Sequence, residues 1–335
     1  MKKCLVLGAS GFLGGAIEHR LKAEGHFVVS VARRPAYALS RPSVADEWNI
    51  VDLTNAPDYH HHFFRHEFDE VYQMAGVVGG LGYIGTGAHD AEILTDSLKI
   101  NLHTLETIRK VGNCGRIFFA SSQCVYPDHR FEIDPFAAER IAPPPSPWKE
   151  TDASFNTFAF GQEKLYAEAL YQAYARNHGI VVRIGRCGNV FGPYSTWSGD
   201  RAKAVAAICR KVATADYAGV VELWGDGQQT RSFTFVDDAV EGILRLMRSD
   251  YPHPVNIAHP DLVSIADLFE TICSVAGKVL AWKPSDGIEG SRNRGSDNTL
   301  CKQVLGWEPA TTLRDGLIRT YPWVKEQAEK ALTKS

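Results

Sequence analysis

Short apolar runs alternate with longer amphipathic stretches through the first half of the chain. Runs of this length that are apolar on both faces predict strands buried inside a sheet. Their alternation with helical stretches is typical of a parallel sheet covered by helices on both faces. We therefore predict an α/β fold, a Rossmann-type doubly wound parallel sheet. The expected strands are CLVLGA (4–9), FVVSVA (27–32), EVYQMA (70–75), RIFFASS (116–122) and VVRIGR (181–186), and the expected helices of this half lie near 16–25, 89–111 and 158–178.

The pattern becomes irregular after about residue 190. Isolated helices are expected at 200–214, 236–248 and 264–276, among turns rich in glycine and tryptophan. The simplest interpretation is a smaller C-terminal α/β region that lies beside the sheet and binds the substrate. Ligands of such folds lie outside the carboxyl ends of the strands, where the two parts would meet. The expected division gives residues 1–188, with about 228–257, to the dinucleotide-binding domain, and residues 189–227 and 258–335 to the substrate-binding region.

Composition narrows the choice of partners and of compartment. The chain has 335 residues, 44% of them hydrophobic, and a formal net charge of −3. This balance gives no electrostatic reason to expect nucleic acid or a membrane as a partner. The apolar run at the N-terminus is short and breaks into glycines, so it is interpreted as a strand rather than a signal peptide. The seven cysteines are scattered without a Cys-x-x-Cys pair, which indicates free thiols in a reducing compartment, by default the cytoplasm.

A glycine turn follows the first expected strand. Gly8, Gly11 and Gly14 stand at the spacing Gly-x-x-Gly-x-x-Gly, with Phe12 and Leu13 inside the turn and a helix after it. Glycines permit a tight turn and let a pyrophosphate approach backbone N–H groups at the start of a helix. A tight turn without a ligand is the alternative, but the strand-turn-helix context favours a dinucleotide.

The second expected strand ends in basic residues rather than an acidic one. An acidic residue at this place would bind the ribose 2′-hydroxyl of NAD. Arg33 and Arg34 stand there instead, and two guanidinium groups suit a 2′-phosphate. NADP is therefore favoured as the cofactor, and NAD is the alternative. If the two arginines bind no ligand, they are simply part of an exposed basic turn. Asp52 and Leu53 are placed to meet the adenine, and Ala75 would let the backbone lie close to the cofactor.

Several later segments carry a family resemblance. With the glycine turn, they resemble the extended short-chain dehydrogenases/reductases that modify nucleotide sugars and, within that family, the GDP-mannose 3,5-epimerases. The resemblance runs in order from residue 3 to about 328, and the last segment is shared more widely among nucleotide-sugar enzymes. The segments are VGGLGYIG (78–85), SSQCVYP (121–127), GRCGNVFGP (185–193), TWSGDRAKA (196–204), WGDGQQTRSFTF (224–235), RGSDN (294–298) and LGWEPATTLRDGL (305–317).

The resemblance implies a reaction in which the sugar is transiently oxidised at C4, which makes the protons on C3 and C5 acidic. Cys124 and Lys203 would then be the acid/base pair on either side of the ring, and Ser122 would bind the C4 oxygen. A thiolate is a competent base once its pKa is lowered by a nearby cation, and a lysine can serve as the opposing acid. The alternatives are ordinary core packing for Cys124 and a solvated surface position for Lys203.

The resemblance also implies a set of substrate contacts. Arginine suits a diphosphate because its planar donors engage two phosphate oxygens at once, and Arg294 resembles this clamp. Each contact taken singly has a surface or capping role as its alternative. The implied set is Gly80, Ser122, Gln123, Asn189, Lys203, Lys211, Gln229, Arg231 and Arg294.

One position departs from the family pattern. The family pairs a catalytic tyrosine with a lysine four residues later, on the same face of a helix. Here Lys164 is present but Phe160 stands where the tyrosine is expected, so the chain lacks the group whose phenolate, as the resemblance implies, accepts the C4 hydroxyl proton. Three explanations of Phe160 remain open. The residue is a laboratory substitution, or the chain is a natural variant that uses another base, such as Cys124 or a water held by Ser122. The third explanation is a non-catalytic sensor of nucleotide sugar or NADP(H). Tyr166 lies on another face and cannot replace the tyrosine.

A 4-epimerase and a 4,6-dehydratase are alternative interpretations of the sequence. A 4-epimerase would not need Cys124 and Lys203, and 4,6-dehydratases place an Asp-Glu pair where this chain has Gln123 and Cys124.

The histidines at 60–62 invite a metal site, but adjacent side chains on a helix point in different directions, so no metal is expected. The family resemblance also implies a homodimer and a GDP-sugar substrate.

Overall fold

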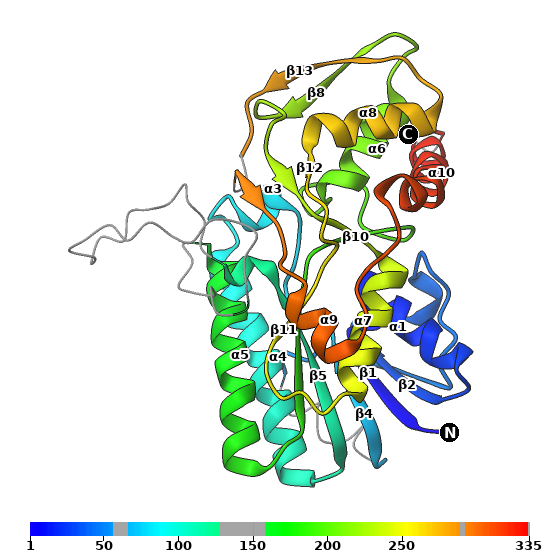
Figure 1. The fold of residues 1–335 in the computed structure, drawn as a ribbon. Helices are drawn as coiled ribbons and strands as arrows, with labels where there is room; N and C mark the ends of the chain where they lie inside the picture. Colours follow the sequence, from blue (N-terminus) through cyan, green and yellow to red (C-terminus); the bar gives the residue numbers. More distant parts are fainter. Residues whose placement is uncertain (56–65, 127–149, 151–157, 289–291, 334–335) are drawn as a thin grey trace, which may run out of the picture.

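The computed structural model describes residues 1–55, 66–126, 150, 158–288 and 292–333, and its centre is a seven-stranded parallel sheet. The strand order is β11-β6-β5-β4-β1-β2-β3, so the chain winds outward in both directions from β1 (Figure 1). The predicted fold is confirmed. The strands are β1 (Lys3–Leu7), β2 (Phe27–Ala32), β3 (Glu47–Ile50), β4 (Phe68–Gln73), β5 (Cys114–Ser122), β6 (Val182–Cys187) and β11 (Val255–Ile257).

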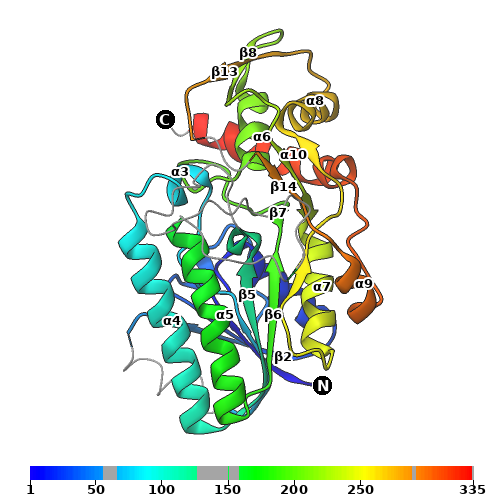
Figure 2. The same ribbon diagram turned by 60° about the vertical axis from the view of Figure 1, so that its left-hand side comes forward.

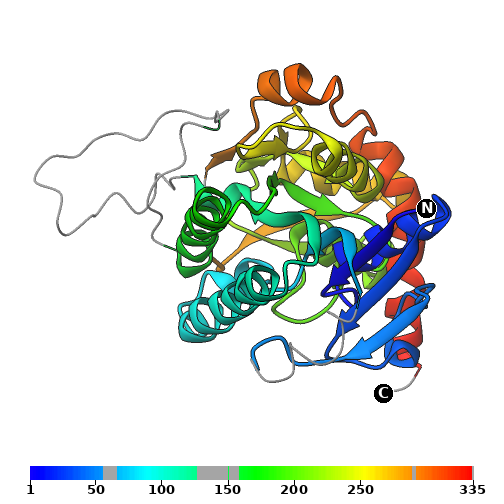
Figure 3. The same cartoon turned by 90° about the horizontal axis from the view of Figure 1, so that it is seen from below.

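Helices cover both faces of this sheet. The helices α1 (Phe12–Ala23) and α7 (Val236–Arg248) pack together on one face, and α4 (Asp90–Val111) and α5 (Ala159–His178) on the other (Figures 2 and 3). Successive side chains of a strand point to opposite faces. In β1, Cys4 and Val6 accordingly join the core on the α1 side, whereas Leu5 and Leu7 join the core on the α4 side. This double burial explains why the strands read as continuous apolar runs.

Most of the remaining elements gather beyond the carboxyl ends of the strands, whereas α9 lies beside β11 and α7 (Figure 1). The helices expected near 200–214, 236–248 and 264–276 are present with slightly later starts for the first and third. Two further helices, α9 and α10, had not been predicted. The elements are α3 (Leu81–Ile84), α6 (Ala204–Thr214), α8 (Ile265–Ala276), α9 (Thr299–Leu305), α10 (Leu313–Leu332), the two short helices η1 (Ala36–Ala38) and η2 (Gln123–Val125), and the strands β7 (Asn189–Phe191), β8 (Val220–Trp224), β9 (Thr230–Arg231), β10 (Phe233–Phe235), β12 (Val263–Ser264), β13 (Ala281–Ser285) and β14 (Asn293–Arg294).

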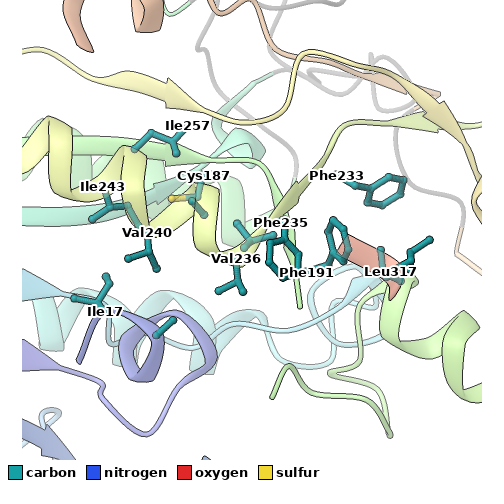
Figure 4. Close-up of a cluster of buried hydrophobic side chains, with 14 of the residues drawn as sticks. Ile17, Cys187, Phe191, Phe233, Phe235, Val236, Val240, Ile243, Ile257 and Leu317 are labelled. Atoms are coloured by element: carbon teal, nitrogen blue, oxygen red, sulfur yellow. The ribbon is translucent and has the colours of Figure 1, made fainter. Parts of the chain in front are cut away.

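A continuous apolar cluster joins the C-terminal elements to the sheet. Figure 4 shows Phe191 and Phe235, from the paired strands β7 and β10, between Val236 at the start of α7 and Leu317 of α10. Phe235 and Leu317 are fully buried, and burial of such side chains contributes about 1.5–3 kcal/mol each. The carboxyl edge of the sheet is therefore held against the C-terminal elements by hydrophobic packing. Within the described ranges, no helix is both long and apolar enough to cross a bilayer.

Candidate active site

The glycine turn after β1 leaves no room for side chains at two of its positions. Gly8 has φ of +84°, and a Cβ there would lie 2.7 Å from the backbone nitrogen of Ala75. A Cβ on Gly14 would lie 2.3 Å from the carbonyl oxygen of Gly8. The turn is thus drawn tightly against α1 and the end of β4, which is the cradle that a dinucleotide needs for close approach of its pyrophosphate. These residues fit such a cofactor.

The predicted recognition residues for the adenosine half lie at the ends of β2 and β3. Arg33 and Arg34 are exposed, and Arg34 donates from Nη2 to the carbonyl oxygen of Ser10 over 3.0 Å. Burial acts to raise the pKa of Asp52, but hydrogen bonds from Thr54 and the charge of Arg33 outweigh it, so the pKa is lowered. Leu53 is buried beside this turn. Basic donors and an ionised carboxylate therefore share this edge of the sheet.

Lys164 lies buried at the centre of the carboxyl edge. Its Nζ is 4.9 Å from the centre of the Phe119 ring, 5.6 Å from that of Phe160, and would be 3.6 Å from a Cβ on Gly76. Its carboxylate partner is Glu163, with 3.5 Å between Nζ and Oε2. The lysine therefore stands beside the backbone of β4's end, where the nicotinamide ribose is expected.

Glu163 and its partner Asn101 carry no motif that would mark them in the sequence. Glu163 has no exposed surface, and Asn101 of α4 donates from Nδ2 to its Oε1 over 3.1 Å. Burial raises the pKa of Glu163, against the opposing charge of Lys164. A Glu-Lys pair at consecutive positions of a helix is usually read as solvated, so its burial was not visible without the packing of α4 on α5.

Phe160 occupies an apolar cluster at the start of α5. The cluster comprises Val77, Tyr83, Ile93, Ala159 and Phe160, with Cys124 packed against it. Phe160 is 7% exposed, so its ring is firmly held beside Lys164. The ring keeps the place expected for the family tyrosine and offers no ionisable oxygen.

The segment after β5 turns immediately into η2. Ser122 caps this short helix, its Oγ accepting from the backbone N–H of Cys124 over 3.1 Å. Gln123 is 2% exposed, and neither polar atom of its amide has a hydrogen-bond partner in the part of the chain that the structure describes. A buried amide without partners is costly, and a bound ligand that supplied them would remove that cost. Gln123 therefore fits a substrate contact.

Arg294 connects the thiol to the C-terminal elements. Its Nη1 donates to the sulfur of Cys124 over 3.2 Å. In the three-stranded sheet β12-β9-β14, Arg294 is the register partner of Arg231. The two arginines predicted to bind phosphate thus lie side by side on neighbouring strands. Like charges in this arrangement repel, and an anion with two negative groups would relieve the repulsion.

Lys203 stands at the N-cap of α6. The backbone before it is fixed by Gly80, whose N–H donates to the Arg201 carbonyl oxygen over 3.0 Å; a Cβ on Gly80 would lie 2.0 Å from the Ala202 oxygen. Lys203 is an exposed residue, as the alternative of a solvated position expects, yet the many protein groups around its amine lower the pKa by desolvation. Charges on Cys124 and Cys187 oppose this shift, so the amine lies within electrostatic range of the predicted thiol partner.

Three other predicted contacts are engaged in hydrogen bonds to nearby backbone. Asn189 donates to the Ser232 carbonyl over 2.9 Å, Lys211 to that of Glu222 over 2.6 Å, and Gln229 to that of Trp224 over 2.8 Å. Oε1 of Gln229 is buried and has no partner among the described residues. These side chains therefore shape the loops around the site, and Gln229 keeps an acceptor for a ligand.

The histidines at 60–62 lie outside the described residues. Among the residues that are described, no group of His, Cys, Asp and Glu is arranged to hold a metal ion.

Comparison with known proteins gives consistent likenesses. Residues 4–258 match the model of the NAD dependent epimerase/dehydratase family. The chain is 39% identical over 329 residues to GDP-mannose 3,5-epimerase 1 of Oryza sativa subsp. indica, covering 98% of this chain and 83% of the relative. It is 38% identical over 334 residues to GDP-mannose 3,5-epimerase of Arabidopsis thaliana, covering 99% and 84%. Among solved structures, UDP-glucuronic acid 4-epimerase of Bacillus cereus with UDP-glucuronic acid and NAD matches with a TM-score of 0.79 at 21% identity, covering 97% of this chain and 99% of that one.

Proposed function

The chain belongs to the NAD-dependent epimerase/dehydratase family, and we propose that it is a nucleotide-sugar epimerase acting on a GDP-mannose-like sugar. The proposed reaction inverts C3, C5 or both through a transient 4-keto sugar. The observation that carries the proposal is the hydrogen bond from the guanidinium of Arg294 to the sulfur of Cys124, with the amine of Lys203 within electrostatic range of the same thiol. A simple 4-epimerase requires neither the thiol nor the second amine.

The roles of the side chains follow from their chemistry. A nicotinamide, when bound, would supply reversible oxidation at C4. Cys124 in its thiolate form removes a proton from the carbon next to the ketone, and Lys203 as an ammonium delivers one from the other face of the ring. Ser122 binds the C4 oxygen, and Gln123 and Asn189 contact the sugar. Arg231 and Arg294 bind the diphosphate, because adjacent guanidinium groups match its charge and geometry.

The cofactor proposed is NADP, with NAD as the alternative. Arg33 and Arg34 at the end of β2 support a 2′-phosphate, because both are exposed cations and Arg34 bonds to the Ser10 carbonyl of the glycine turn. Lys164 holds the nicotinamide ribose near Gly76. The glycine turn itself does not discriminate between the two dinucleotides, so the choice rests on these arginines.

Phe160 removes the hydroxyl group from the family's base position. Without a phenol, the C4 hydroxyl has no side-chain base at the family position, and general acid/base catalysis contributes about 10² to 10⁴-fold. We propose that this chain binds its ligands and turns over slowly. Phe160 also supports a second candidate function, a non-catalytic protein that binds nucleotide sugar or NADP(H).

The proposal extends to organisation. Residues 1–188, with about 228–257, form the dinucleotide-binding domain, and 189–227 with 258–335 bind the nucleotide sugar. The protein is proposed to be a cytoplasmic homodimer. Its neighbouring helices α4 and α5 (Figure 2) are the proposed dimer face.

Deuterium wash-in tests the function directly. The chain and its Phe160→Tyr variant are incubated with GDP-mannose and cofactor in D₂O, and recovered sugar is analysed by NMR. Exchange at C3 or C5 that rises strongly in the variant supports the epimerase. If neither form exchanges any carbon-bound proton or converts any nucleotide hexose, while both bind GDP-mannose, the non-catalytic function replaces it.

A further inference from the structure

A small cavity lies against the outer side of the glycine turn. It is lined on one side by Ser10, Gly11 and Phe12, and on the other by Arg41 of the loop that follows η1, and Tyr194 of the turn after β7 closes it. The predicted NADP residues Arg33 and Arg34 lie on the neighbouring turn, and Arg34 bonds to the Ser10 carbonyl. The sequence did not single out Arg41 or Tyr194.

The guanidinium of Arg41 is held by stacking rather than by an anion. Its central carbon lies 4.4 Å from the centre of the Tyr194 ring. Its stem lies over the first turn of α1, because a Cβ on Gly15 would be 3.6 Å from Cδ. No hydrogen bond or ion pair joins this guanidinium to another residue in the described ranges. Its donors are therefore available to a ligand in the cavity.

Tyr194, on which Arg41 stacks, takes up an uncommon backbone conformation. Its φ is 70°, in the left-handed region that bulky residues seldom adopt. Its ring centre also lies 5.4 Å from that of Trp323 in α10. The ring is thus fixed between the C-terminal helix and Arg41, and such strain persists only where surrounding packing over-determines it.

The loop that carries Arg41 is fastened to α1 by a buried carboxylate. Oε1 of Glu18 accepts hydrogen bonds from Ser43 Oγ over 2.8 Å and from the Val44 N–H over 2.7 Å. Oε2 accepts from Ser30 Oγ over 2.6 Å. A hydrogen bond of 2.8 Å also joins His19 Nε2 to the Pro42 carbonyl. The carboxylate oxygens are thus engaged with neutral donors of the loop and β2, and the loop is held in one place. Arg41 is therefore positioned before any ligand arrives.

We propose that Arg41, stacked on Tyr194, is a third cation that binds the 2′-phosphate and selects NADP over NAD. This inference rests on the proposed dinucleotide site. A dianionic phosphate between Arg34 and Arg41 would accept charge-assisted hydrogen bonds from both sides, with Ser10 at its base. NAD has a hydroxyl in this place and gains little from the guanidinium. The contact therefore separates the two dinucleotides instead of strengthening both.

Fluorescence titration with NADPH and with NADH, in the absence of sugar, tests the proposal. Arg41→Gln should weaken NADPH binding about 10 to 100-fold, as expected for loss of hydrogen bonds to a charged group, and leave NADH within about threefold. Tyr194→Phe keeps the stacking ring and should resemble the unaltered chain. Arg176→Gln, an exposed arginine in the last turn of α5, is the matched control and should change neither affinity. Competition against NADPH gives a second measurement. In Arg41→Gln, 2′,5′-ADP should become a weaker competitor, whereas 5′-ADP, which has no 2′-phosphate, should compete as it does in the unaltered chain.

Each result decides between specific alternatives. If Arg41→Gln weakens NADPH and NADH equally, the arginine serves the pyrophosphate or the fold, and the 2′-phosphate role is wrong. If it changes neither affinity, Arg41 only offsets the charge of Glu18. An unaltered chain that binds NADH as tightly as NADPH overturns the NADP preference itself, whereas failure of the epimerase reaction is seen separately in the deuterium experiment.

Discussion

Arg294 and Cys124 lie 170 residues apart in the chain, and the guanidinium of one donates to the sulfur of the other over 3.2 Å. The contact couples β14, whose Arg294 is proposed to bind phosphate, to η2 directly after β5. It places the thiol directly beside the cation that is proposed to bind the diphosphate, so substrate binding and carbon acid chemistry share one residue.

Substitution should separate these two roles. In the Phe160→Tyr background, Cys124→Ser should lower deuterium exchange at least 100-fold, because a serine hydroxyl is a far weaker base, while GDP-mannose affinity changes little. Arg294→Gln should weaken GDP-mannose binding about 10 to 100-fold, through lost charge-assisted hydrogen bonds. Affinity is measured by calorimetry. Arg292→Gln, at a neighbouring exposed arginine paired with Asp226, should leave binding near that of the parent; an equal loss there would assign the effect to general charge.

Phe160→Tyr should raise turnover by about 10² to 10⁴-fold. The ring already lies beside Lys164, so the added hydroxyl needs only a small adjustment of the apolar cluster around it. Conversion of GDP-mannose is followed by NMR with saturating cofactor. Tyr166→Phe, on the exposed face of the same helix, should have no effect. Turnover that stays unchanged in a folded Phe160→Tyr protein would mean that another base already serves C4.

Much of the sheet could be predicted because strands buried on both faces read as apolar runs. The pairing of β9 with β14 could not be predicted, because each strand is only two residues long and has no hydrophobic pattern. Only the register of this pair brings Arg231 beside Arg294. Arg41 and Tyr194 meet through tertiary packing alone. By contrast, α10 carried a readable signal: Thr312 followed three residues later by Asp315 is an N-terminal capping pattern, and the Thr312 side chain does accept from the Asp315 N–H.

Lys203 should make the rate of deuterium exchange fall on the alkaline side of its pH profile. Desolvation lowers its pKa below the ordinary 10.5, so the ammonium that donates a proton is lost at a lower pH than for a free lysine. In the Phe160→Tyr background, the exchange rate should fall along this limb as pH rises. Lys203→Arg stays protonated and should remove the limb while slowing exchange about 10² to 10³-fold, with GDP-mannose affinity kept within a few-fold. A limb that persists in Lys203→Arg belongs to another group.

The lowered pKa also fixes the sign of a stability effect. In the folded protein the charged form of Lys203 is disfavoured relative to the unfolded chain, so it costs stability below the folded pKa. The cost disappears as pH rises from there toward 10.5. Because Lys203 is an exposed residue, solvent screens most of this cost, so Lys203→Met should be only slightly more resistant to urea than the parent at pH 7, with the difference shrinking at alkaline pH. A variant that is less stable at pH 7 would show that the amine is paired rather than desolvated.

Glu106 should stabilise the pairing of α4 with α5 at neutral pH and lose this effect in acid. Arg109 donates to it from Nε and Nη2 over 3.1 and 2.8 Å, and Tyr174 of α5 donates to Oε1. The bonds from Arg109 and Tyr174 lower the pKa of Glu106 from 4.5 to about 2. Because the folded pKa is depressed, the stabilisation is complete above pH 4.5 and is lost as pH falls toward 2.

Urea unfolding of Glu106→Gln measures this contribution. The variant should be less stable than the parent by about 1 kcal/mol at pH 6, the usual size for a partly exposed charged hydrogen bond, and the two should converge as pH approaches 2. Glu67→Gln, an exposed carboxylate before β4, controls for the loss of one negative charge and should follow the parent throughout. Tyr174→Phe should reproduce part of the loss at pH 6. A difference between parent and Glu106→Gln that is independent of pH would assign the effect to the new amide donor rather than to loss of the ionised carboxylate, and the ionised hydrogen bonds would then contribute nothing.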